Sequence, residues 1–126
     1  MLMKTSIFLF VFLFGGTAYV LLELIWRRRS HVSMFFAGGF CFMLLFSLYG
    51  KVDMPLLFKC IAGGTVITAV EFLTGALVNI RMKLNVWDYS GLPLNLYGQI
   101  SLPFSLGWCL LSLPISFLCD YFLSFA

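Results

Sequence analysis

The chain is poor in charged residues, because Lys, Arg, Asp and Glu make up only 10% of its 126 residues. Soluble domains typically carry about 25% charged residues, so this shortage argues against a surface that faces water. No GxxxxGK[ST] phosphate-binding loop occurs, which excludes an ATPase within this chain. The net charge of +3 is small and sits at the ends of apolar segments, so nucleic acid is not an expected partner.

The sequence also has a single histidine and no cysteine pair with metal-binding spacing. His31 is the only histidine, which excludes a histidine-rich metal site and argues against a Ser–His catalytic pair. It lies in a basic turn, where we expect it to face solvent or lipid headgroups. The cysteines form no CxxC motif and stand singly in apolar segments, at Cys41, Cys60, Cys109 and Cys119. Isolated cysteines of this kind are typical of packing positions. The sequence therefore predicts no metal and no cofactor.

Hydrocarbon side chains dominate instead: 62% of the residues are hydrophobic and the mean hydropathy is +1.04. Lipid offers no partner for unpaired backbone groups, so helices are expected. Four apolar segments, each long enough to cross about 30 Å of hydrocarbon as a helix, cover about residues 6–26, 32–49, 56–80 and 100–122. We predict an all-α membrane protein with four transmembrane helices, one integral-membrane domain over 1–126 and a polar loop at 81–99.

Basic residues in the short loops predict the orientation of these spans. Five follow the first and third spans and three lie on the opposite side: Arg27, Arg28, Arg29, Arg81 and Lys83 against Lys4, Lys51 and Lys59. This excess favours a cytoplasmic 81–99 loop and places both termini on the extracytoplasmic side. Because the difference is small, a dimer of oppositely oriented copies remains an alternative.

A short pattern occurs twice in the chain. The segment GGTAYVLLE at Gly15–Glu23 returns as GGTVITAVE at Gly63–Glu71, 48 positions later. This spacing predicts a tandem repeat of two helical hairpins, in which Glu23 and Glu71 approach a common axis. The alternative is a chance match, since glycine pairs are common in membrane helices. We expect the three glycine pairs, including Gly38-Gly39, to be points of close helix packing.

The third span carries polar groups that are costly inside a membrane. Glu71, Gly75 and Asn79 are spaced four apart and so share one helix face. Glu71 is a candidate proton carrier, cation ligand or general acid, with Asn79 aligned beside it. The alternative is a structural carboxylate that accepts hydrogen bonds across the bundle. Glu23 is a weaker candidate, because Arg27 lies one turn away and favours an interfacial ion pair.

The segment after this span concentrates most of the remaining polar chemistry. We expect its aromatic residues to be anchors at the membrane–water boundary: Trp87, Tyr89 and Trp108. Gly91 and Pro93 predict turns. We interpret the segment as re-entrant or half-helical, presenting Asp88, Asn95 and Gln99 toward the bundle as binding candidates. An ordinary anchored loop is the alternative.

These residues carry a family resemblance. The pattern WDYS…P.N..GQI.LP.S..W at 87–108, after a helix with E…TG…N, resembles the family named Putative ABC-transporter type IV, the CmpB-like permeases of Gram-positive bacteria. The segment RRRSHVSMFFAGGFCF is similar to that family's first turn and second helix. The resemblance spans about residues 19–121 and implies a four-helix protein of the bacterial cytoplasmic membrane. By motif it indicates the positions Glu71, Asn79, Trp87, Asp88, Tyr89, Asn95, Gly98, Gln99 and Trp108. Arg28 and Arg29 depart from the Gly-aromatic pair expected in the first turn.

The favoured function is a small permease or transporter subunit, with Glu71 as a proton- or cation-coupled carboxylate and the 88–99 segment as a cytoplasmic gate. Four short helices leave little room for a solute path, so we expect a homo-oligomer or a larger membrane complex in contact with lipid. An ATPase partner would be a separate chain. One alternative is a membrane-embedded enzyme that modifies a lipid or isoprenoid by acid catalysis. Another is a non-catalytic assembly partner whose loop docks a cytoplasmic protein.

Overall fold

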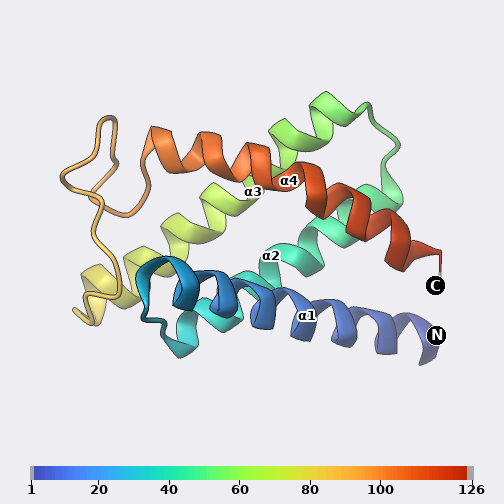
Figure 1. Ribbon diagram of the computed structural model, residues 1–126, viewed down its shortest axis with the longest axis horizontal. Coiled ribbons are helices and arrows are strands. Elements are labelled where there is room, and N and C mark those ends of the chain that lie inside the picture. Colours follow the sequence, from blue (N-terminus) through green and yellow to red (C-terminus); the bar gives the residue numbers. More distant parts are fainter. Residues whose placement is uncertain (1, 125–126) are drawn as a thin grey trace.

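Four long helices make up the protein in a computed structural model that describes residues 2–124, with side chains from residue 6 onward (Figure 1). The helices are α1 (Leu2–Arg27), α2 (Val32–Lys51), α3 (Leu56–Gly75), which continues as the π-helix η1 (Ala76–Arg81), and α4 (Leu102–Leu123). All four are long and apolar enough to cross a membrane. The predicted all-α class with four membrane-length helices is confirmed, and the chain is a multi-pass membrane protein.

Side-chain hydrogen bonds cap the starts of α2 and α4. His31 precedes α2, and its ring Nδ1 accepts a hydrogen bond from the Ser33 backbone N–H at 3.1 Å. The Ser101 hydroxyl caps α4 by accepting from the Phe104 N–H at 3.4 Å. Such caps satisfy the free N–H groups of a first turn. His31 therefore has a structural role as a helix cap, which its position in a basic turn did not indicate.

Glycine pairs hold the first hairpin together, as predicted. A Cβ atom on Gly15 would lie 2.9 Å from the Gly38 carbonyl oxygen, and one on Gly38 would lie 2.9 Å from the Gly15 carbonyl oxygen. The backbones of α1 and α2 are therefore as close as their main-chain atoms allow. In the second hairpin, Gly63 of α3 faces Ser112 of α4. Close approach of this kind lets dispersion forces stabilise helix pairs in lipid.

The outer surface of the bundle is apolar, which suits contact with acyl chains. Leu9 of α1, Leu73 of α3 and Leu110 of α4 are 60%, 68% and 75% exposed. Such side chains would be costly in water but face a matching solvent in a bilayer. The main buried cluster, which includes Leu45 and Phe46 of α2, fills the interior between the helices.

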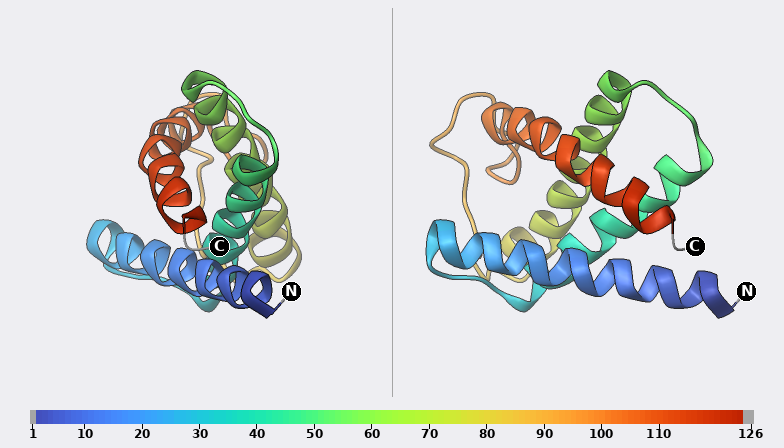
Figure 2. Two further views of the ribbon diagram at one scale, coloured as in Figure 1. Left: turned by 90° about the vertical axis from the view of Figure 1, so that its right-hand side faces the viewer. Right: turned by 45° about the vertical axis from the view of Figure 1, so that its right-hand side comes forward.

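The two hairpins meet unevenly along their length. Phe10 and Phe14 of α1 contact Phe122 of α4, with ring centroids 5.2 Å apart in both pairs. From there α1 and α4 diverge toward the opposite end of the bundle (Figures 1 and 2). The loop of residues 82–101 runs across that end, from η1 to the start of α4 (Figure 1). Glu71 and Asn79, two of the polar residues singled out by the sequence, lie beneath this loop and hydrogen-bond to it. The arrangement agrees with two paired hairpins, while the tandem repeat itself stays a prediction.

Candidate functional site

Glu71 is the centre of the polar cluster. Its side chain is buried, with 6% exposure, although it is acidic and lies on a membrane-spanning helix. One carboxylate oxygen accepts a hydrogen bond from the Tyr89 hydroxyl at 2.8 Å, and the other accepts from the Trp108 indole N–H at 3.1 Å. Among the described side chains, no lysine, arginine or histidine forms an ion pair with Glu71. Both of these donors are neutral.

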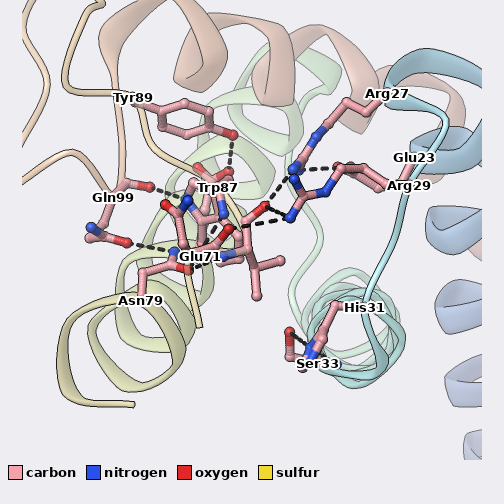
Figure 3. A network of polar contacts seen from close by, with 12 residues as sticks. Glu23, Arg27, Arg29, His31, Ser33, Glu71, Asn79, Trp87, Tyr89 and Gln99 are labelled. Carbon is pink, nitrogen blue, oxygen red and sulfur yellow. Dashed lines mark hydrogen bonds and ion pairs between the residues drawn. The ribbon is translucent and has the colours of Figure 1, made fainter. Parts of the chain in front are cut away.

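Asn79 joins the end of α3 to the start of the loop. Its carbonyl oxygen accepts from the Val86 N–H at 2.7 Å, and its amide donates to the Gln99 side-chain oxygen at 2.8 Å (Figure 3). Asn79 lies on η1, where the backbone widens from α- to π-helical hydrogen bonding. Single π-helical turns frequently occur at functional sites. One side chain thus holds both ends of the loop against the helix.

Gly75 makes room for the loop to pack tightly on α3. A Cβ atom at this position would lie 2.5 Å from the Gln99 side-chain oxygen and 3.0 Å from the Trp87 ring. Trp87 and Gln99 are both buried, and the Trp87 indole N–H donates to the Gln99 backbone oxygen at 3.0 Å. Glu71, Gly75 and Asn79 therefore share one helix face, as the spacing predicted, and that face carries the loop.

The end of α1 and the connection that follows it contribute two arginines to the cluster. Arg27 forms an ion pair with Glu23 at 3.0 Å, as expected from their spacing. Its other terminal nitrogen donates to the Val86 backbone oxygen, and Arg29 donates to the Asn85 backbone oxygen at 3.3 Å. Val86 is consequently held from two helices, through its oxygen by Arg27 of α1 and through its N–H by Asn79 of η1.

Tyr89 connects the loop to the Glu71 carboxylate. Burial raises the pKa of its hydroxyl well above the ordinary value, and the nearby Glu71 and then Glu23 raise it further, while Arg27 acts in the opposite direction. The hydroxyl therefore remains a hydrogen-bond donor at any physiological pH. Its ring stacks on Phe104 at the start of α4, with 4.6 Å between centroids and an interplanar angle of 11°. Tyr89 is thus fixed at both its hydroxyl and its ring.

Asp88 and Asn95 lie elsewhere in the loop. Asp88 is exposed and accepts from the Ser90 N–H at 2.9 Å, and these contacts with Ser90 hold its pKa below the ordinary value. Asn95 closes a turn by donating to the Leu92 oxygen at 2.9 Å and accepting from the Gly98 N–H at 3.1 Å. Of the three polar loop residues expected to face the bundle, Gln99 is the one that is buried against α3.

A cavity of about 220 Å³ lies between the hairpins, and Glu71 is part of its wall. Side chains of all four helices line it, together with Trp87 from the loop. Its walls are almost wholly apolar, with aromatic residues prominent among them: Phe14, Tyr19, Phe42, Trp87 and Trp108. An acidic group at the edge of such a space can bind a proton or a cation.

The sequence located most of this cluster but not all of its contacts. Among the predicted residues, Glu71, Asn79, Trp87, Tyr89, Gln99 and Trp108 come together. Trp87, expected as an interfacial anchor, is 6% exposed and packs on Met34 and Val78 inside the protein. The contacts from Arg27 and Arg29 to the loop were missed. Their separation of more than 50 positions from the loop left no local signal for them.

The described residues include no group of three or more His, Cys, Asp or Glu side chains placed to hold a metal ion. No curated protein and no solved structure matches the chain. A family model does match, over residues 7–125, and its description is "Putative ABC-transporter type IV". Since the match covers nearly the whole chain, this four-helix membrane protein belongs to the Putative ABC-transporter type IV family.

Proposed function

We propose that the protein is a permease or transporter subunit in which Glu71 binds the transported solute or its coupling ion. The observation that carries this proposal is the placement of Glu71, buried at 6% exposure in the wall of a cavity built by all four helices. Ionisable residues inside membranes commonly mark substrate or ion pathways. Family membership supports the same class of function.

The loop of residues 82–101 serves as the gate of this site. Tyr89 links the loop to Glu71 directly, and Asn79 links it to the same helix two turns further on. A proton or cation that binds the carboxylate competes with the Tyr89 hydroxyl for the same oxygen. Occupation of Glu71 therefore weakens one of the contacts that hold the loop closed, which couples binding to opening.

We infer that more than one chain forms the complete transporter. The cavity has a volume of only about 220 Å³, which by itself is too small for a path across a membrane. A second copy or a larger membrane complex supplies the rest of the pathway, and an ATPase, where one drives transport, is a different polypeptide. We place the complex in the bacterial cytoplasmic membrane, with the loop on the cytoplasmic side and both termini outside.

A complementation experiment tests this function for a solute of any identity. Cells that lack the gene receive wild-type protein or the Glu71→Gln variant, and small molecules and lipids are measured in cells and medium by mass spectrometry. We expect wild-type protein, and not the variant, to restore the distribution of at least one solute between cells and medium. Equal gel-filtration behaviour and membrane abundance show that the variant folds.

The same measurement separates the alternatives. A change in the chemical structure of a lipid or isoprenoid, with solute distribution unaltered, would support a membrane-embedded enzyme instead. Full restoration by a folded Glu71→Gln variant would remove Glu71 from the mechanism and refute the proposal. No chemical change in either fraction, with a partner protein recovered on purification, would indicate an assembly subunit.

A further inference from the structure

The cavity beside Glu71 has a chemical character that restricts its ligand. Its wall combines one acidic side chain with five aromatic rings, those of Phe14, Tyr19, Phe42, Trp87 and Trp108. Neutral donors hold the two carboxylate oxygens at 2.8 and 3.1 Å, and no cationic side chain among the described residues pairs with this group. A buried charge without a counter-ion is costly, so an ionised Glu71 requires a positive partner.

The two arginines that contact the loop are already engaged with other groups. Arg27 pairs with Glu23 at 3.0 Å and donates to the Val86 oxygen, and Arg29 donates to the Asn85 oxygen. Neither arginine lines the cavity, whereas Trp87 and Trp108 both do. Aromatic faces, and tryptophan most strongly, attract cations that have shed their water. A positive charge beside Glu71 would therefore have to come from a ligand.

We propose that this cavity binds a small lipophilic organic cation, such as a quaternary ammonium that carries one aromatic or short alkyl group. The cationic centre lies beside Glu71 and against the tryptophan rings, and the apolar group fills the space between α1 and α4. A hydrated metal ion fits poorly, because the walls offer few oxygen atoms to replace its water. At about 220 Å³ the cavity is smaller than the roughly 300–1,000 Å³ of drug-sized pockets, which favours a ligand of this size.

This inference rests on the proposed function in one respect, because both assign ligand binding to Glu71. The experiment measures binding alone, without transport. Radiolabelled benzyltrimethylammonium serves as the probe, with purified full-length protein in phosphatidylcholine nanodiscs and empty nanodiscs as the blank. Neopentylbenzene is the matched competitor, since it has the same shape with carbon in place of the charged nitrogen. We expect saturable binding that unlabelled cation displaces and that neopentylbenzene displaces at least tenfold less well.

Three variants identify the site. Glu71→Gln should weaken binding more than tenfold, because it removes the counter-charge. Ala18→Leu adds bulk to the cavity wall at a residue that takes no part in the polar cluster, and it should also reduce binding more than tenfold, so the test survives a folding defect in the first variant. Asp120→Asn removes a carboxylate at the other end of α4, paired with Lys59 at 3.7 Å, and should leave binding within twofold of wild type.

Failure of the cation to bind would overturn the inference, and two further results would overturn it even where the cation binds. One is equal displacement by neopentylbenzene and by the cation, which would show a site for apolar molecules such as acyl chains. The other is wild-type affinity in both Glu71→Gln and Ala18→Leu. If the cation fails to bind while cells still require Glu71 for transport, the ligand class is wrong and the proposed function stands. If the cation binds and Glu71→Gln transports normally, the proposed function fails instead.

Discussion

The two segments that share the GGT-and-glutamate pattern have similar sequences and different surroundings. Glu23 on α1 pairs with Arg27 one turn later, at 3.0 Å, and Arg27 also reaches the loop. Glu71 on α3 has Gly75 at the matching position, and that glycine admits Gln99 and Trp87 of the loop instead of a cation. The same acidic residue is therefore a member of a salt bridge in one hairpin and a buried group held by neutral donors in the other.

The two segments also differ four residues further along the chain. The position that corresponds to Asn79 in the first segment is His31, which lies beyond the end of α1 and caps α2. In the second segment the helix extends through η1, so Asn79 is still on a helix and can hold the loop. Helix length, rather than the repeated pattern itself, explains why the candidate site lies on the second hairpin.

The largest effect is expected from removing Asn79, the residue that has no equivalent on α1. In Asn79→Leu the Val86 N–H and the Gln99 side-chain oxygen lose their partner. Each buried polar group left unpaired costs about 1–3 kcal/mol. Unfolding in mixed micelles should show this loss, and the Val86 amide should exchange its hydrogen faster. The same Val86 exchange rate in variant and wild type would show that Asn79 does not hold the loop.

A second substitution tests whether the absence of a side chain at Gly75 causes the difference between the two segments. Gly75→Leu places a side chain where Gln99 and Trp87 now lie, and overpacking of this kind costs about 1–3 kcal/mol. Gly107→Leu is the matched control, because a Cβ on Gly107 meets no atom within 4 Å. The melting temperature should fall for the first variant and change little for the second. Equal melting temperatures for the two variants would contradict close packing at Gly75.

Tyr89 provides a spectroscopic test of the link between loop and carboxylate. Its raised pKa means that its proton is bound more tightly in the folded state, so its contribution to stability is complete below the ordinary value of 10.0. The contribution is lost as the pH rises through the raised value. The difference in tyrosinate absorbance between wild type and Tyr89→Phe should therefore emerge only well above pH 10. A difference that emerges at or below that pH would show that the Tyr89 hydroxyl is exposed to solvent.

The smallest effect is expected at Glu23. Its partner Arg27 is 27% exposed in its side chain, and partly exposed ion pairs typically contribute less than about 1 kcal/mol. Glu23→Gln should lower the unfolding free energy by no more than this, and by less than Asn79→Leu does. A loss as large as that of Asn79→Leu would mean that the two glutamates have more similar roles than their surroundings indicate.

Prediction from the sequence was most successful where one helix decides the outcome. Glu71, Gly75 and Asn79 share a face because helical spacing places them there, and all three contact the loop. The ion pair between Glu23 and Arg27 followed from the same rule. These relations join residues four positions apart on one helix, and that spacing can be read directly from the sequence.

Relations between distant segments were not visible in the same way. No local pattern indicated that Arg27 reaches Val86, because 59 positions separate them. Trp87 has the amphipathic ring of an interfacial residue, yet it is buried, since Gly75 leaves room for it against α3. Asp88 has the charge of a site residue but lies on the exposed side of the loop. The path of the loop determines that Trp87 is buried against α3 and that Asp88 is exposed.

The sequence by itself determined that four helices cross a membrane, because lipid forces apolar segments of this length to satisfy their backbone groups internally. It also determined which face of the third helix is polar. The tertiary structure alone decided that this face meets the loop and that a cavity remains beside Glu71 between the hairpins. The physical reason is that helices form from local hydrogen bonds, whereas the cavity depends on how side chains from all four helices pack together.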